Sequence, residues 1–173
     1  MKKTIKINLS PSSIRQARQE IDHEKRWLME KNEEFVRKLA DKGFSIIEDQ
    51  IQIAQGDSDK SHYTHVEINR FQTYAQARLV VEGKDILFIE FGAGVHYNGA
   101  AGSSPHPEGV KYGYTIGSYG KGLGKNDHWF YRDGTGAVQK SYGTQATMPV
   151  YTAYKTLGEE ETFLRIAEEV FNG

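Results

Sequence analysis

The sequence predicts an α+β fold, in which a long N-terminal helix and a C-terminal helix pack on one face of an antiparallel β-sheet. Residues 12–54 and 149–171 carry apolar side chains at helical spacing, with charged side chains between them. Residues 62–91 contain three short runs typical of strands, and their links are short enough for hairpins. We therefore expect helices at both ends of the chain and a β-meander between them.

Composition favours one folded domain spanning residues 1–173, because 38% of the residues are hydrophobic and 12% are aromatic. The net charge of −1 gives no overall positive field, so neither a membrane nor a specific nucleic acid is predicted as a partner. The chain has no cysteine, which excludes disulfides, thiol catalysis and cysteine-ligated metals. Residues 4–13 lack the apolar core of a signal peptide, and we expect a soluble protein that is not classically exported.

The N-terminal region predicts a short strand followed by a long helix. Residues 4–9 alternate polar and apolar side chains with a period of two, and Ser10-Pro11 is a typical helix start. Gly43 lies on the apolar face of the helix, where it marks either a break between two helices or close contact with a neighbour. That face is formed by Ile14, Ala17, Ile21, Leu28, Phe35, Leu39 and Ile46.

Three strands are predicted next, over residues 62–71, 74–82 and 85–91. In the second run, Ala75, Ala77, Leu79 and Val81 alternate with mostly polar residues, which indicates a half-buried strand. The third run, Ile-Leu-Phe-Ile-Glu-Phe at residues 86–91, is almost continuously apolar and ends at glycine. We expect this run to be the central, buried strand of the sheet.

Residues 92–125 contain ten of the 18 glycines and are expected to form a long flexible loop. Residues 128–142 then predict a β-hairpin, whose turn lies at the Asp-Gly-Thr-Gly of residues 133–136. The final helix is expected over residues 149–171, and Gly158 with the three glutamates after it is a candidate interruption.

Motifs for catalysis or nucleotide binding are weak. The glycine-rich residues 117–125 fail the phosphate-loop pattern, because Tyr119 stands where the first glycine is needed and Asn126 where Ser or Thr is needed. No nucleophile elbow is present. Glu90 is the most interesting acid, and a structural hydrogen bond to loop backbone is favoured over a catalytic role. No catalytic residue and no cofactor is predicted.

Histidines offer one alternative, a metal site built from His96, His106 and either Asp127 or His128. Their spacing matches no strong zinc pattern, so ordinary hydrogen-bonded histidines are the default interpretation. His62 and His65 are three residues apart on a predicted strand, which places them on opposite faces.

Tyrosines and lysines interleave around the glycine-rich region. Such a surface could stack on single-stranded nucleic acid, or it could bind protein, where tyrosine is favoured and glycine lets a loop adapt. The net charge near zero favours protein contact. The candidate partner or oligomer contacts are Tyr97, His106, Lys111, Tyr112, Tyr114, Tyr119, Lys121 and Lys125.

Three segments in the second half of the chain resemble one known family. They read Ile-Glu-Phe-Gly-Ala-Gly at residues 89–94, Trp-Phe-Tyr-Arg at residues 129–132 and Ala-Thr-Met-Pro-Val-Tyr at residues 146–151. In order and spacing they are similar to the tail-component family of long-tailed bacteriophages, the neck or tail-completion proteins encoded between head and tail genes. Residues 54–61 depart from the family, since the expected Pro-x-x-Thr-Gly-x-Leu type of segment is missing.

The resemblance implies a structural virion protein of a phage or prophage, without catalytic activity, that assembles as a ring at the head–tail joint. Its partners would be sister copies and the neighbouring head-completion and tail-terminator or tail-tube proteins. It would occur in the virion and, during assembly, in the host bacterial cytoplasm. Two alternatives remain open: a metal-dependent phage enzyme acting on cell wall or nucleic acid, and a host module that binds a small ligand.

Overall fold

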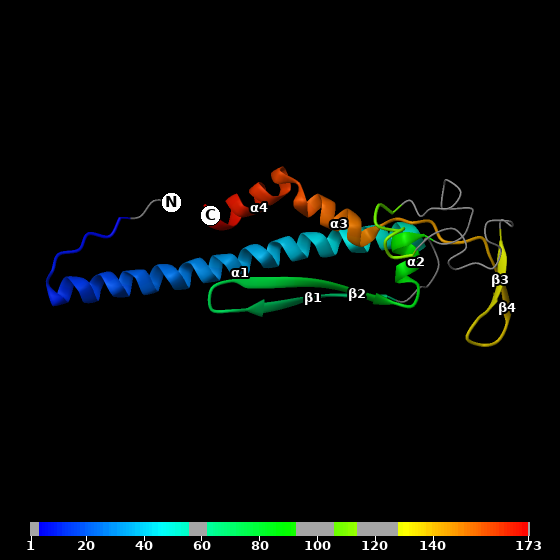
Figure 1. The fold of residues 1–173 in the computed structure, drawn as a ribbon, viewed down its shortest axis with the longest axis horizontal. Coiled ribbons are helices and arrows are strands. Elements are labelled where there is room, and N and C mark those ends of the chain that lie inside the picture. The colour runs from blue at the N-terminus through cyan, green and yellow to red at the C-terminus, as the bar shows by residue number, and fades with distance from the viewer. Residues whose placement is uncertain (1–3, 56–61, 93–105, 114–127, 173) are drawn as a thin grey trace.

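The computed structural model describes residues 4–55, 62–92, 106–113 and 128–172, and it has the predicted α+β class (Figure 1). No helix within these ranges is both long and apolar enough to cross a membrane. The elements in chain order are α1 (Pro11–Gln55), β1 (His62–Arg70), β2 (Ala75–Gly83), α2 (Ile86–Phe91), β3 (Trp129–Arg132), β4 (Val138–Ser141), α3 (Pro149–Gly158) and α4 (Glu160–Phe171).

Helix α1 is the axis of the molecule and runs for 45 residues without interruption. At ~1.5 Å per residue it is about 67 Å long. Ser10 caps its first turn: the Ser10 side-chain oxygen accepts a hydrogen bond from the Ser13 amide at 3.3 Å, and Pro11 occupies the first helical position. The long helix predicted from the apolar stripe is confirmed as a single piece.

Gly43 does not break α1 but lets two other elements approach it closely. A β-carbon at this position would lie 2.6 Å from Leu79 Cδ1 on β2 and 3.0 Å from Leu157 Cδ1 on α3. The first of these distances is shorter than carbon atoms tolerate. Gly43 was predicted either to break the helix or to allow close contact with a neighbour, and the structure confirms the close contact.

Strands β1 and β2 form an antiparallel hairpin whose inner face packs on α1. The register places Val66 opposite Leu79 and Ile68 opposite Ala77, so the apolar side chains share one face. The outer face pairs mostly polar side chains, such as Glu67 with Arg78. His62 and His65 lie on opposite faces as predicted, since His62 contacts Glu48 of α1 and His65 contacts Glu67.

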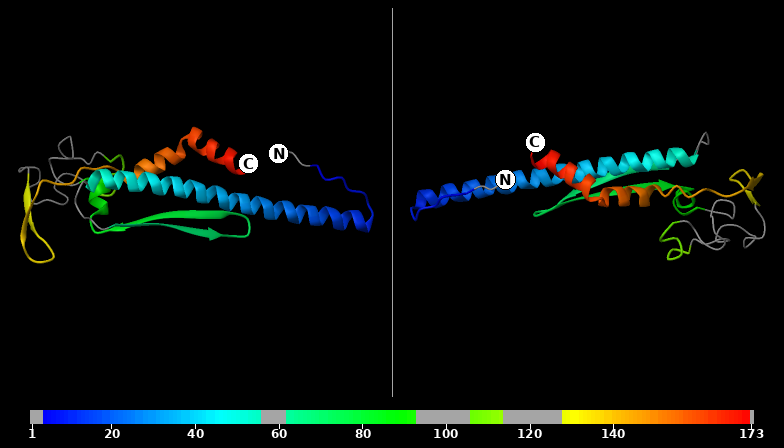
Figure 2. Two further views of the ribbon diagram at one scale, coloured as in Figure 1. Left: turned by 180° about the vertical axis from the view of Figure 1, so that it is seen from behind. Right: turned by 90° about the horizontal axis from the view of Figure 1, so that it is seen from above.

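Helices α3 and α4 pack along α1 on a different side from the hairpin (Figures 1 and 2). The rings of Phe35 and Phe163 meet edge to face at 5.1 Å, and those of Trp27 and Phe171 at 6.4 Å. The prediction had placed both helices on the sheet, whereas α1 lies between the hairpin and the C-terminal helices. The predicted interruption is confirmed: the backbone is extended at Glu159, between α3 and α4.

Two predicted strands are absent from the described residues. Residues 4–9 join no sheet, and residues 86–91 form the short helix α2. A short apolar run suits either a buried strand or a buried helix turn. Here the helix brings Ile86, Ile89 and Glu90 onto one face, and Ile89 joins the core formed with Ile47, Ile51 and Ala153. The predicted three-stranded meander is therefore a two-stranded hairpin followed by a helix.

The β-hairpin predicted after the glycine-rich segment is confirmed. Strands β3 and β4 form the hairpin expected within residues 128–142, with Tyr131 opposite Gln139. Its turn is held by Asp133, whose Oδ1 accepts hydrogen bonds from the Thr135 amide at 2.9 Å and the Ala137 amide at 3.1 Å. Most of the predicted loop at 92–125 lies outside the described residues, apart from Gly92 and residues 106–113.

Candidate functional site

Glu90 is a buried carboxylate that caps a helix other than its own. It lies on α2 and is 6% exposed. Its Oε2 accepts a hydrogen bond from the Val150 amide at 2.8 Å, and its Oε1 accepts one from the Tyr151 amide at 2.9 Å. These amides belong to the first turn of α3, where helical N–H groups have no partner within the helix. Negative charge is also favourable at that end of a helix.

The sequence before α3 explains why an external cap is needed. Met148 precedes the helix and makes no side-chain cap, and Pro149 takes the first helical position. The Ile89 carbonyl, next to Glu90, accepts hydrogen bonds from the Thr147 amide at 3.0 Å and the Met148 amide at 3.4 Å. Residues 89 and 90 therefore hold the whole entry into α3.

His106 completes this arrangement from a third segment of the chain. Its Nε2 lies 3.1 Å from Glu90 Oε1, and its Nδ1 accepts a hydrogen bond from the Glu108 amide at 3.0 Å. Because a backbone N–H points at Nδ1, the ring proton resides on Nε2 and is donated to Glu90. The imidazole is 7% exposed and packs against Phe91 and Tyr151 at ring distances of 4.4 and 5.0 Å.

We call Ile89, Glu90, His106, Val150 and Tyr151 the junction. It joins α2, α3 and residues 106–113. A further bond to α1 comes from the neighbouring Thr147, whose hydroxyl donates to the Gln50 carbonyl at 3.1 Å. Two of the segments that carry the phage resemblance, around Glu90 and around Tyr151, thus meet at one buried place although about 60 residues separate them. The hydrogen bonds of the junction fix α2, α3 and residues 106–113 to one another.

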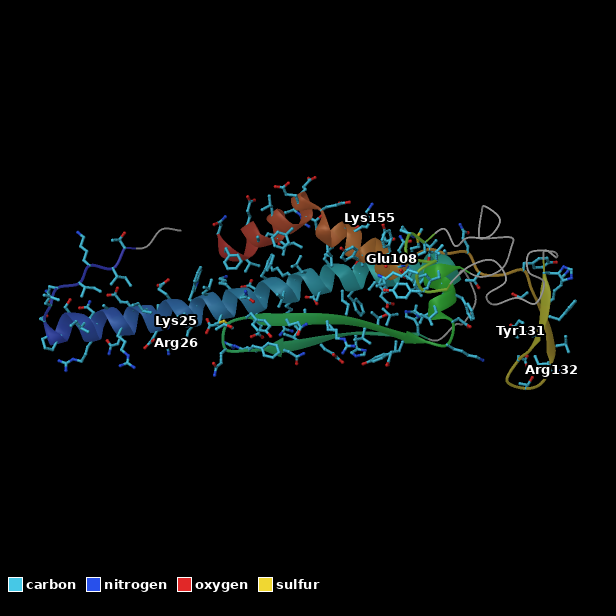
Figure 3. All side chains as sticks on the ribbon, in the orientation of Figure 1. Lys25, Arg26, Glu108, Tyr131, Arg132 and Lys155 are labelled. Carbon is cyan, nitrogen blue, oxygen red and sulfur yellow. The ribbon has the colours of Figure 1, made fainter. Side chains whose placement is uncertain are left out.

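Residues 106–113 lie beside the junction and carry exposed side chains, among them Glu108 (labelled in Figure 3), Lys111 and Tyr112. Lys111 Nζ lies 2.7 Å from Glu108 Oε2 and 5.1 Å from the centre of the Tyr112 ring. The hydrogen bond and the charge of Lys111 lower the pKa of Glu108, and those of Glu108 raise the pKa of Lys111. Tyr112 is 57% exposed, while its ring approaches Phe91 at 5.8 Å.

The predicted contact residues have three different outcomes. Lys111 and Tyr112 lie at the surface, as a contact role requires. The prediction for His106 is wrong, because its side chain is buried and bonded to Glu90 instead of being available to a partner. The remaining candidates lie outside the described residues: Tyr97, Tyr114, Tyr119, Lys121 and Lys125.

The structural role predicted for Glu90 agrees with its hydrogen bonds, although the partner is α3 and not loop backbone. Sequence reasoning missed this partner. The available signal was the start of α3, where Met-Pro stands without a Ser, Thr, Asp or Asn to cap the helix. A helix start without its own cap indicates that an acceptor comes from elsewhere in the fold.

The alternative of a histidine metal site can be followed only within the part of the chain that the structure describes. That part contains no group of three or more His, Cys, Asp or Glu residues that could hold a metal ion. His128 instead packs against Phe130 and Tyr142, at ring distances of 5.5 and 6.0 Å. His96 and Asp127 lie outside the described residues.

Comparison with known protein families, curated proteins and solved structures found no match for this chain. The likeness to phage tail-component proteins therefore rests on the sequence segments alone.

Proposed function

We propose that this protein is a structural component of a phage or prophage particle, which completes the neck between head and tail through protein–protein contacts. It would bind sister copies and the neighbouring head-completion and tail-terminator or tail-tube proteins. It would be found in the virion and, while particles assemble, in the host bacterial cytoplasm.

The observation that carries this proposal is the junction. The Ile-Glu-Phe-Gly and Met-Pro-Val-Tyr segments, on which the family resemblance depends, contact each other through Glu90 and the first turn of α3. A buried carboxylate with donors on both oxygens stabilises the fold. The segments that carry the family resemblance thus hold this fold together, as expected in a protein whose role is structural.

The surface of the molecule supports the same function. Along the first part of α1, Ile14, Ile21 and Leu28 are 52%, 43% and 53% exposed. They recur every seven residues on one face of the helix, which is the spacing of helix–helix contacts. Exposed apolar side chains gathered on one face are typical of protein interaction surfaces.

The test is a deletion of the gene in the phage or prophage that encodes it. Electron microscopy should then show filled heads and complete tails that fail to join, and supply of the intact chain should restore whole particles. Normal yields of infectious particles without the chain would contradict the proposal. Substitution of Glu90 by alanine should copy the deletion, because it weakens the fold, whereas substitution of the exposed Glu168 should not.

A further inference from the structure

Residues 4–9, which we call the arm, have the pattern of a strand without a sheet. Their sequence, Thr-Ile-Lys-Ile-Asn-Leu, alternates polar and apolar side chains, yet they join no ladder within the described residues. Ile7 is 58% exposed and Leu9 is 97% exposed. Period-two alternation is useful only when one face of a strand is covered. The arm therefore has the sequence of a half-buried strand, but its apolar side chains at Ile7 and Leu9 are exposed.

The β1–β2 hairpin has strand edges to which a further strand could be added. It has two strands of nine residues each, and no further strand pairs with it in the described ranges. A two-stranded ribbon is marginal by itself, and an unpaired edge offers a row of N–H and C=O groups to another strand. The hairpin is thus a ready acceptor for a third strand.

The edge of β1 is the open one. Leu79 and Val81 of β2 pack against the core that α1, α2 and α3 share, so the β2 side of the hairpin is the covered one. On the β1 side, His62 binds Glu48 of α1 at 3.0 Å. Phe44 lies one helical turn before Glu48, on the same side of α1, and is 37% exposed. A strand added beside β1 would find an uncovered aromatic ring there for its apolar face.

Side-chain chemistry on β1 fits the arm. If Ile5, Ile7 and Leu9 face α1, Lys6 lies on the outer face with His65 and Glu67. Lys6 would bring a positive charge to a face that carries the exposed Glu67 carboxylate.

The arm cannot reach its own hairpin. The tip of the hairpin lies at Asn32, whose Oδ1 accepts a hydrogen bond from the Ala75 amide at 3.0 Å. Between Pro11 and Asn32, α1 rises about 32 Å at ~1.5 Å per residue. Fully extended, the six residues of the arm span about 20 Å at ~3.3–3.6 Å per residue. A β1 edge that the arm can reach must therefore belong to another copy.

We propose that the arm of one copy adds as a third strand to the edge of β1 in a second copy. Such a contact joins two different surfaces, so repetition around a closing rotation yields a ring. The proposal rests on the proposed neck function for its biological setting. Its own test uses purified protein and is independent of whether particles form.

Single-cysteine crosslinking tests the contact, because the chain has no cysteine of its own. Protein with Lys6→Cys is mixed with size-tagged protein that carries Glu67→Cys on β1, and a short bismaleimide is added. A matched mixture uses Lys155→Cys, an exposed position on α3 (Figure 3). We expect a mixed crosslinked dimer with Glu67→Cys and none with Lys155→Cys.

Light scattering supplies the second readout. The intact chain should form oligomers at high protein concentration, and deletion of residues 1–9 should return it to monomer with unchanged helical circular dichroism. Absence of the mixed dimer, equal crosslinking to both positions, or oligomers that persist without residues 1–9 would each overturn the proposal. If the crosslink forms but gene deletion leaves particles intact, the contact stands and the neck function fails.

Discussion

The two halves of α1 have the same apolar spacing, but one half is buried in the subunit and the other is exposed. In the C-terminal half, Ile47 and Ile51 are 1% and 0% exposed, because the hairpin, α2 and α3 cover them. In the N-terminal half, Ile14 and Leu28 are more than half exposed. Helix α4 ends at Phe171, beside Trp27, and in the described residues no other helix or strand covers α1 before that point (Figure 1). The C-terminal half of α1 holds the subunit together, and the N-terminal half is available to partners.

The largest effect should come from truncating the covered half. Ile51→Ala removes a fully buried side chain and should lower the free energy of unfolding by about 2–5 kcal/mol, measured by urea denaturation. Ile21→Ala, on the exposed half, should change it by less than about 0.5 kcal/mol. Similar losses for both variants would break the distinction between the two halves.

The junction should come next. Glu90→Ala leaves the Val150 and Tyr151 amides and the His106 ring without their acceptor, and we expect a loss of roughly 2–3 kcal/mol of stability. Glu168→Ala, at an exposed position on α4, is the control and should be nearly neutral. If thermal denaturation places both variants at the same midpoint, the junction does not stabilise the fold.

A smaller effect is expected at Gly43, where β2 and α3 converge on α1. Gly43→Ala should cost roughly 1–3 kcal/mol, because the new methyl group overlaps Leu79. Gly158→Ala adds the same atoms where no neighbour lies within 4 Å, so its stability should be unchanged or slightly higher. A tolerated alanine at Gly43 would mean that the three elements are not closely packed there.

The smallest effect concerns the β3–β4 turn and pH. Hydrogen bonds from Thr135 and Gln139 lower the pKa of Asp133 from 3.8 to about 2. Because the folded value is the lower one, the turn gains stability above about pH 3.8, and this gain is lost as the pH falls through about 2. The Thr135 amide signal in NMR should titrate near 2, and Asp133→Asn should abolish that titration. A midpoint near 3.8 would contradict the hydrogen bonds of the turn.

Much of the fold could be predicted from sequence because its signals are local. The apolar stripe of α1, the Asp-Gly-Thr-Gly turn and the interruption after Gly158 each depend on neighbouring residues. The errors concern tertiary context. Residues 86–91 are apolar enough for strand or helix, and only the core around Ile89 selects the helix.

The candidate site shows the same limit. A structural role could be predicted for Glu90, because it stands in an apolar run. Its pairing with α3 and with His106 could not, since nothing local in the sequence encodes which distant amides meet the carboxylate. His106 was misjudged for this reason: its position in a glycine-rich segment indicates exposure, whereas its hydrogen bond to Glu90 buries it.

Hydrogen exchange at low and high protein concentration tests most directly whether the arm and β1 contact another copy while the junction belongs to the folded subunit. We expect protection of residues 4–9 and of β1 to rise with concentration, while the amides of Val150 and Tyr151 at the junction stay equally protected throughout. Protection that is independent of concentration in the arm and β1, or that changes only at the junction, would contradict this expectation.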